Sequence, residues 1–235
     1  MLKIALTHTA TRLDNYLAWL RQDPDLDVHV LCAQDNFFPD LESFDGLVFT
    51  GGVDMYPPLY GGSLAYSGAP DTFDYQRDIF EIGLFHQAQK LRLPTLAICR
   101  GIQLVGVALG APLIQDLQTA GYQDHTQNPN GEDGEHMVRC SGSRFFSESL
   151  ELCVNSAHHQ ALASAPAGFR MTGFSMPDGV PEVLESENPD FFLLALQWHP
   201  ERLHLKPAAC APAADIPRRA WKEAVEKRNF EKINL

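Results

Sequence analysis

A cysteine near the middle of the chain separates two segments with different patterns. The segment 91–98 is mostly apolar, which predicts a buried strand. After Cys99, the apolar residues Ile102, Val105 and Leu109 follow at helical spacing. A cysteine on such a turn faces the helix N-terminus, whose dipole favours thiolate over thiol. The segment therefore predicts a cysteine nucleophile on a sharp elbow, with a buried free cysteine as the simpler alternative.

A histidine and a glutamate stand two residues apart in the sequence Gln-Trp-His-Pro-Glu near the end of the chain. If this segment is extended, the side chains of His199 and Glu201 point to the same face. An imidazole beside a carboxylate is the base and orienting partner that a thiol nucleophile requires. On its own the pair is more typical of a strand end at the surface, but together with Cys99 it predicts a catalytic triad.

Two glycines follow a predicted strand at 45–50. A glycine pair at such a place most often makes a simple turn that requires a positive φ angle. The alternative is a loop whose bare N–H groups face a ligand, and cysteine acyl transfer needs such donors for its oxyanion. The N–H of Arg100, directly after the cysteine, is the usual second donor of an elbow. Because ligands gather at the carboxyl ends of parallel strands, we expect Gly51 and Gly52 to lie near Cys99.

A metal site is the competing interpretation of some of the same residues. Cys99, His158, His159, His199 and Glu201 carry suitable donor atoms. The adjacent histidines and the His-Pro-Glu sequence do not match the usual ligand spacings, and no second cysteine lies near Cys99. The sequence therefore predicts an enzyme that binds no metal and needs no cofactor.

The remaining patterns predict the elements that position these residues. Strand, helix and strand alternate from the start of the chain, which is the opening of a parallel α/β sheet. The predicted strands are 2–6, 27–32, 45–50, 91–98, 136–140, 150–155, 171–174, 183–187 and 191–196. The predicted helices are 11–21, 74–91, the helix after Cys99, and 215–227. We expect the last helix to pack on the sheet through Trp221 and Val225.

Other polar features receive no catalytic role from their spacing. Arg77 and Glu81 stand four residues apart on the predicted helix 74–91, which is typical of a solvated ion pair. The segment 121–135 is polar and rich in Gly and Asn, which predicts a flexible loop. His125 lies in this loop and His136 follows it, and both are expected to be surface histidines.

Composition and charge exclude several classes of protein. The chain has 235 residues, enough for one large α/β domain, and 45% of them are hydrophobic. Its formal net charge of −12 argues against nucleic acid or an anionic membrane as a partner. The five cysteines form no CxxC pair, which is typical of free thiols in a reducing compartment. No segment has the pattern of a signal peptide or a membrane span, so we expect a cytoplasmic protein.

Four motifs occur in one order and together carry a resemblance to a known family. They are Asp-Gly-Leu with Gly-Gly-Val-Asp at 45–54, Ala-Ile-Cys-Arg-Gly-Ile-Gln at 97–103, Asn-Ser-Ala-His-His-Gln at 155–160 and Gln-Trp-His-Pro-Glu at 197–201. With them the chain resembles the class I glutamine amidotransferase-like superfamily. Within it, the chain is most similar to the γ-glutamyl-γ-aminobutyrate hydrolase branch of the γ-glutamyl hydrolase-like cysteine peptidases. The resemblance covers residues 45–201.

This resemblance implies a fold, an activity and a set of site residues. The fold is a three-layer α/β/α domain of residues 1–235, with a flavodoxin-like, mostly parallel central sheet and a nucleophile elbow. The activity is hydrolysis of the γ-glutamyl amide bond of a small molecule through a thioester, with release of glutamate. Cys99 is then the nucleophile, His199 the base and Glu201 its partner. The implied oxyanion and substrate-binding residues are Gly51, Gly52, Arg100, Gln103, His158, His159 and Gln160.

Alternatives on the same fold stay open. The Arg-Gly pair after Cys99 resembles the stand-alone hydrolases, because ammonia-channelling relatives usually carry an apolar or aromatic residue there. The alternatives are a glutaminase subunit that supplies ammonia to a synthetase and a non-catalytic binding module. Gly106 and Ala111 stand where the family more often has Asn and Gly, and the loop 121–135 is short. Both departures affect the expected substrate pocket, so the sequence does not determine which amine is released. The oligomeric state is open too, with a homodimer as one option.

Overall fold

The computed structural model describes residues 1–35, 38–203 and 210–234. Its strands are β1 (Leu2–Thr7), β2 (Leu26–Leu31), β3 (Gly46–Phe49), β4 (Thr95–Ile98), β5 (Leu113–Ile114), β6 (Gly134–Cys140), β7 (Leu150–Ser156), β8 (Ala161–Leu162), β9 (Phe169–Ser175), β10 (Pro181–Ser186) and β11 (Leu193–Leu196). Its α-helices are α1 (Leu13–Leu20), α2 (Tyr75–Leu91), α3 (Arg100–Ala108), α4 (Pro200–Leu203) and α5 (Ala211–Ile233). Short 3₁₀ helices occupy Ala33–Asp35, Leu41–Ser43 and Pro57–Tyr60.

In the described part of the chain, nine strands form one sheet in the order β2-β1-β3-β4-β11-β10-β9-β6-β7. The first five are parallel, and their order is that of a flavodoxin-like sheet. The other four continue the sheet in antiparallel pairs and form an antiparallel extension. β5 and β8 make a separate antiparallel pair. The predicted α/β fold with a parallel centre is confirmed, and the pairing of the later strands is an addition that the sequence patterns did not assign.

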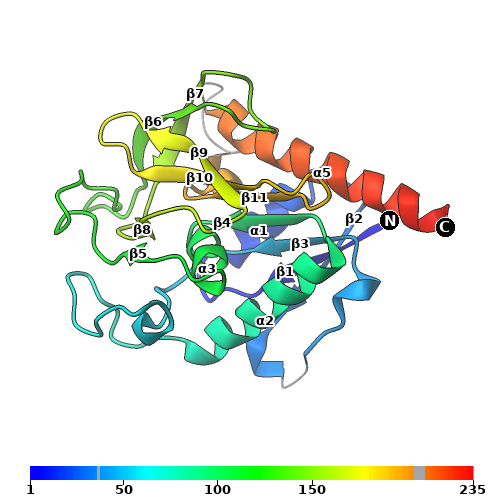
Figure 1. Ribbon diagram of the computed structural model, residues 1–235, viewed down its shortest axis with the longest axis horizontal. Coiled ribbons are helices and arrows are strands. Elements are labelled where there is room, and N and C mark those ends of the chain that lie inside the picture. The colour runs from blue at the N-terminus through cyan, green and yellow to red at the C-terminus, as the bar shows by residue number, and fades with distance from the viewer. Residues whose placement is uncertain (36–37, 204–209, 235) are drawn as a thin grey trace.

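Helices cover both faces of the parallel strands (Figure 1). On one face α1 and α5 pack on the sheet, with Trp19 and Trp221 fully buried. On the other face α2 and α3 bury Phe85 and Ile102. A parallel strand with helices on both faces must be apolar on both, which explains the continuous apolar run of β3. The predicted three-layer arrangement is therefore present.

Two capping residues, which the apolar periodicity does not reveal, determine where α2 begins and ends. The Asp74 carboxylate accepts a hydrogen bond from the Arg77 N–H at 3.0 Å and caps the start of the helix. Arg92 adopts a left-handed φ of 51° and ends it. The strand predicted at 91–98 consequently begins only at Thr95.

The C-terminal helix α5 also differs from its predicted bounds, because it begins at Ala211 rather than at Asp215. Trp221 and Val225 are buried in the core, as expected. None of the helices in the described part of the chain combines the length and the apolar character that a bilayer crossing requires.

The three central strands bring distant residues to one edge of the sheet. β3, β4 and β11 are parallel neighbours, so their carboxyl ends lie together. Gly51 follows β3, Cys99 follows β4 and His199 follows β11. The topology thus assembles the predicted site at the place where α/β folds usually bind ligands.

Candidate active site

Cys99 is the single residue between β4 and α3, and its φ of 54° and ψ of −106° are rare for a residue with a side chain. Such backbone strain costs about 1–3 kcal/mol and is concentrated at functional sites. The Cys99 N–H donates to the Leu196 carbonyl at 2.8 Å, so a bond to β11 helps to hold the conformation. The residue is 6% exposed. The sharp strand-to-helix elbow predicted at this cysteine is present.

His199 and Glu201 meet, but not for the predicted reason. β11 ends at Leu196, and Glu201 lies in the helical turn α4 instead of an extended segment. The alternation argument is therefore wrong, because the chain turns at Pro200. His199 Nδ1 nevertheless lies 2.8 Å from Glu201 Oε1, and the glutamate also contacts Arg202 Nε at 3.3 Å.

His199 is buried yet strongly favours its protonated form. Burial lowers its pKa, but the Glu201 carboxylate and the Cys99 side chain together raise the pKa of His199 to about 9. Since Nδ1 faces Glu201, Nε2 is the nitrogen left for the cysteine. At neutral pH His199 is therefore an imidazolium that can donate a proton.

Gly51 lies against both the cysteine and the histidine. A Cβ atom at this position would be 2.9 Å from His199 Cε1, 3.0 Å from Tyr16 Oη and 3.5 Å from Cys99 Cβ, which explains the glycine. The Gly51 N–H donates to Tyr16 Oη at 2.9 Å, and this oxygen is 3.5 Å from His199 Nδ1. Tyr16, which the sequence patterns did not single out, thus connects Gly51 and Gly52, which we call the glycine loop, to the histidine.

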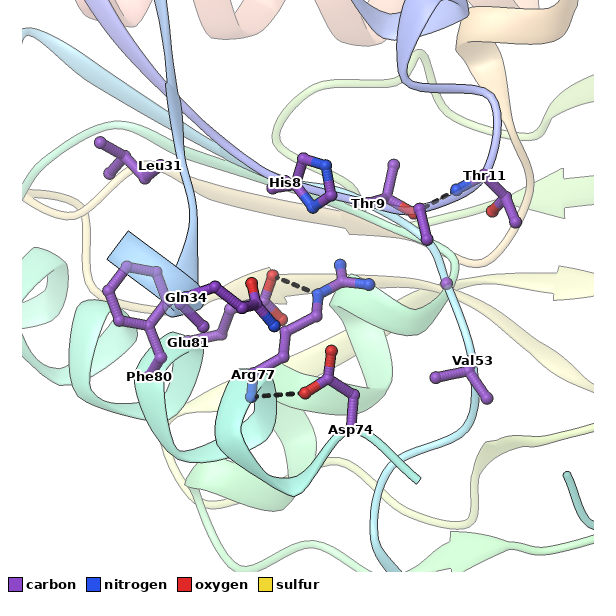
Figure 2. Close-up of a pocket in the computed structure, with 13 residues that line it drawn as sticks. His8, Thr9, Thr11, Leu31, Gln34, Val53, Asp74, Arg77, Phe80 and Glu81 are labelled. Atoms are coloured by element: carbon purple, nitrogen blue, oxygen red, sulfur yellow. Dashed lines mark hydrogen bonds and ion pairs between the residues drawn. The ribbon is translucent and has the colours of Figure 1, made fainter. Parts of the chain in front are cut away.

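Gly52 continues the loop with a φ of 155°, and a Cβ atom there would be 2.2 Å from Arg77 Nη1. Arg77 Nη2 donates to Thr50 Oγ1 at 2.9 Å and to the Gly51 carbonyl at 3.0 Å. Figure 2 shows the Arg77 side chain reaching from α2 toward the segment just before Val53. The Gly51 N–H is already bonded to Tyr16, whereas the Gly52 N–H has no acceptor among the described residues.

Arg77 and Glu81 correct a prediction, because this ion pair is buried rather than solvated. Their side chains are 8% and 1% exposed, and Arg77 Nε donates to Glu81 Oε1 at 3.0 Å. Asp78 and Glu81 also pair with the Arg100 guanidinium. Two guanidiniums and two carboxylates therefore tie α2 to α3 and to the glycine loop. The helical spacing could not indicate this, because α3 covers that face of α2 only in the folded chain.

A cavity of about 200 Å³ borders the glycine loop (Figure 2). Gly52, Arg77 and Glu81 line it, and its other walls come from the segments 8–11 and 31–34 and from the start of α2. Cys99, His199 and Glu201 are not among its lining residues. The cysteine therefore does not open into this cavity.

Gln103 and Gln160 are buried and use their amides within the protein. Gln103 Nε2 donates to the Gln160 carbonyl at 3.2 Å and to Gln197 Oε1 at 3.4 Å. Gln160 Nε2 donates to the Gln115 carbonyl at 3.1 Å. These contacts brace the segment after β7 against α3 and against the residues that lead to His199.

The adjacent histidines His158 and His159 diverge. His159 Nε2 is 2.9 Å from Asp54 Oδ2, and its ring stacks on Tyr66 of the loop that follows the two glycines. His158 Nε2 is instead 3.5 Å from Glu182 Oε1 in the antiparallel extension. The structure therefore separates a pair that was predicted to line one site.

His125 and His136 are also corrected, because neither is a surface residue. Their side chains are 3% and 9% exposed, and both face Glu182. The loop 121–135 folds back toward β7, where the His158 N–H donates to the His125 carbonyl at 2.9 Å. This long-range packing is invisible in a polar, Gly-rich sequence.

Two polar residues that the sequence analysis missed position His199. Asn155 Oδ1 accepts a hydrogen bond from the His199 N–H at 3.0 Å. Asn155 Nδ2 and Arg202 Nη1 each donate to the Asp133 carboxylate at 2.9 Å. Asn155 opens the motif at 155–160 and was thus within reach of sequence reasoning, whereas Asp133 carries no signal of its own.

The fold and the elbow define a class I glutamine amidotransferase-like protein. The model of the Peptidase C26 family matches residues 30–201, and the chain belongs to this family. The fold agrees with the crystal structure of a glutamine amidotransferase from Thermotoga maritima, with a TM-score of 0.59 and 17% identity over 98% of this chain and 97% of that one.

The relatives with similar sequences include two bacterial proteins. Protein NtpR of Enterococcus hirae is 37% identical over 169 residues, which is 70% of each chain. The γ-glutamyl-γ-aminobutyrate hydrolase PuuD of Escherichia coli K12 is 31% identical over 172 residues, covering 68% of this chain and 65% of the relative. The chain is therefore a glutamine amidotransferase-like hydrolase that acts on amide bonds.

Proposed function

We propose that this protein hydrolyses the γ-glutamyl amide bond of a small γ-glutamyl compound through a thioester on Cys99, and that it acts without a partner protein. The observation that carries the proposal is the cysteine on a strained elbow, which borders Gly51 together with a buried His199 whose ring faces Glu201 at 2.8 Å. The similarity to PuuD, a γ-glutamyl-γ-aminobutyrate hydrolase by name, supports the same substrate class.

The first half of the reaction forms the thioester. The Cys99 thiolate attacks the side-chain amide carbon of the γ-glutamyl group, and the carbonyl oxygen becomes an oxyanion. The N–H groups of Gly52 and Arg100 are the donors we assign to it, because the Gly51 N–H is already bonded to Tyr16. The C–N bond then breaks as His199 donates its proton to the leaving amine.

The second half releases glutamate. Neutral His199 accepts a proton from water, which attacks the thioester carbonyl. The collapse of this second tetrahedral intermediate breaks the C–S bond and returns the sulfur as a thiolate beside the imidazolium. The new carboxylic acid of glutamate then loses its proton to the solvent. Glu201 holds the His199 ring and stabilises its positive charge through the 2.8 Å contact in both halves.

A panel of γ-glutamyl amines, including γ-glutamyl-γ-aminobutyrate and glutamine, tests the proposal by the glutamate that is released. Cys99→Ala is expected to abolish release, while circular dichroism shows that the variant is folded. Cys32→Ala is the matched control, because that cysteine is half-exposed and directly follows β2.

Normal turnover by Cys99→Ala, or no glutamate from any amine in the panel, would overturn the proposal. Release from glutamine alone, with a rate that rises when a synthetase is added, would replace it with the glutaminase alternative.

A further inference from the structure

A second buried cluster, which we call the histidine cluster, lies in the antiparallel extension. It consists of His125, His136, His158 and Glu182. Glu182 Oε1 is 3.1 Å from His136 Nε2, 3.5 Å from His158 Nε2 and 3.8 Å from His125 Nδ1. The Glu182 side chain is fully buried, and it forms no ion pair with an arginine or lysine of the described residues.

Two of the three rings are oriented by acceptors outside the cluster. His125 Nε2 is 3.0 Å from Asp178 Oδ2, and His158 Nδ1 is 3.0 Å from the Gln160 carbonyl. A carboxylate and a carbonyl only accept hydrogen bonds, so these nitrogens carry the protons. The other ring nitrogens, Nδ1 of His125 and Nε2 of His158, face Glu182, and His125 Nδ1 also lies 3.3 Å from Ser156 Oγ. In the neutral rings these two nitrogens carry the lone pairs that can bind a cation. Histidines that bind metals are oriented by such acceptors on the far nitrogen.

Two buried polar atoms of the cluster lack the partners that burial normally demands. His158 Nε2 and Glu182 Oε2 have no hydrogen-bond partner among the residues that the structure describes. Both belong to side chains that are at most 2% exposed. An imidazole lone pair and a carboxylate oxygen, both buried and both left unused, are the donor atoms that a bound cation would satisfy.

We propose that the histidine cluster is a structural zinc site. Three imidazoles and one carboxylate are a ligand set that suits Zn²⁺. Tetrahedral ligation with bonds of about 2.0–2.1 Å places donor atoms roughly 3.3 Å apart. The three distances around Glu182 Oε1 bracket this value. The donor atoms of His125, His136 and Glu182 all lie within 4.8 Å of one another and form the compact part of the site. His158, whose Nε2 is 3.5 Å from Glu182 Oε1, is the fourth ligand and has to move toward the other three.

The ion would brace the antiparallel extension against the candidate active site. The ligands come from the loop before β6, from β6 itself, from the segment after β7 and from β10, which are far apart in sequence. The Gln197 N–H donates to the Glu182 carbonyl at 2.8 Å, two residues before His199. With four protein ligands the site has no open position, so its role is structural and not catalytic.

The metal content of the purified protein tests the proposal. The untagged chain is dialysed against zinc and then against metal-free buffer, and bound zinc is measured by inductively coupled plasma mass spectrometry. We expect about one zinc per chain in the wild type and in the control His86→Gln, whose histidine is exposed on α2. We expect less than a tenth of that in His136→Gln and in Glu182→Gln. Asp178→Asn should weaken zinc binding by about 10–100-fold in a competition with a chelating indicator.

A second measurement avoids variants that fail to fold. The metal-free wild type is titrated with Co²⁺, which reports tetrahedral ligation through strong visible absorption bands. Saturation at one Co²⁺ per chain, reversed by zinc, supports the proposal. A wild type that retains no zinc and gives no such bands, or a folded Glu182→Gln that keeps its full zinc content, overturns it.

Discussion

Two groups of buried carboxylates in this molecule are neutralised in different ways. Beside the glycine loop, Asp78 and Glu81 pair with the guanidiniums of Arg77 and Arg100. In the antiparallel extension, the ion-pair partners of Glu182 among the described residues are all imidazoles. Both groups lie close to the segments that hold the candidate active site, and both are almost inaccessible to water.

The kind of counter-charge determines how each group can act. An arginine stays charged at any physiological pH, so the first group is permanently balanced and serves as a fixed support for Gly51 and Gly52. The charge of a histidine depends on a proton or a metal, so the second group can exchange its counter-charge. Glu201 is an intermediate case, because it contacts both Arg202 and the titratable His199.

The largest effect on stability is expected when the guanidinium of Arg100, which balances Asp78 and Glu81, is removed. Arg100→Leu leaves Asp78 and Glu81 with one guanidinium between them, and breaking such a buried pair costs about 3–5 kcal/mol. Urea denaturation measures the free energy of unfolding. The control is Arg139→Leu, which breaks an exposed pair with Glu151 and should cost about 1 kcal/mol or less. Equal losses in the two variants would show that the buried group is not a support.

The intermediate case is tested through the pH dependence of the reaction. Below about pH 9 His199 is protonated and can donate to the leaving amine, so kcat/KM of the wild type should fall as the pH rises through that value. Glu201→Gln removes a cause of the raised pKa, so the fall should begin at lower pH. The rate near neutral pH should drop on the order of 10²-fold. If the fall of kcat/KM at high pH occurred at the same pH in Glu201→Gln as in the wild type, Glu201 would not be a cause of the raised pKa of His199.

The smallest effect on the free energy of unfolding is expected when the histidine cluster loses the carboxylate of Glu182. In the presence of a chelator, which keeps the protein free of metal, Glu182→Gln removes the buried negative charge itself. The histidines around it can stay neutral, so no buried charge is left unpaired. The free energy of unfolding should therefore change by only about 1 kcal/mol. Zinc at 100 times its dissociation constant should stabilise the wild type by about 2.7 kcal/mol and leave the variant unchanged. If metal-free Glu182→Gln lost as much unfolding free energy as Arg100→Leu, the two groups of carboxylates would not differ in how their charge is balanced.

The sequence contained enough to predict most of the elements and the place of Cys99 and His199 at the carboxyl ends of neighbouring strands. Continuous apolar runs indicate parallel strands because helices cover both faces, and β3 follows this rule. The turn at Cys99 could be predicted because a strand pattern changes to a helix pattern within one residue. The four ordered motifs also carried the family, which the Peptidase C26 match over residues 30–201 confirms.

Tertiary structure alone decided which polar residues share an environment. Arg77 and Glu81 have the spacing of a surface pair, and only the packing of α3 buries them. His158 and His159 are adjacent, yet they face different partners because β10 lies beside one and the loop 53–70 beside the other. The physical reason is that local patterns record the periodicity of one element, whereas burial and charge pairing depend on neighbours that folding brings from elsewhere in the chain.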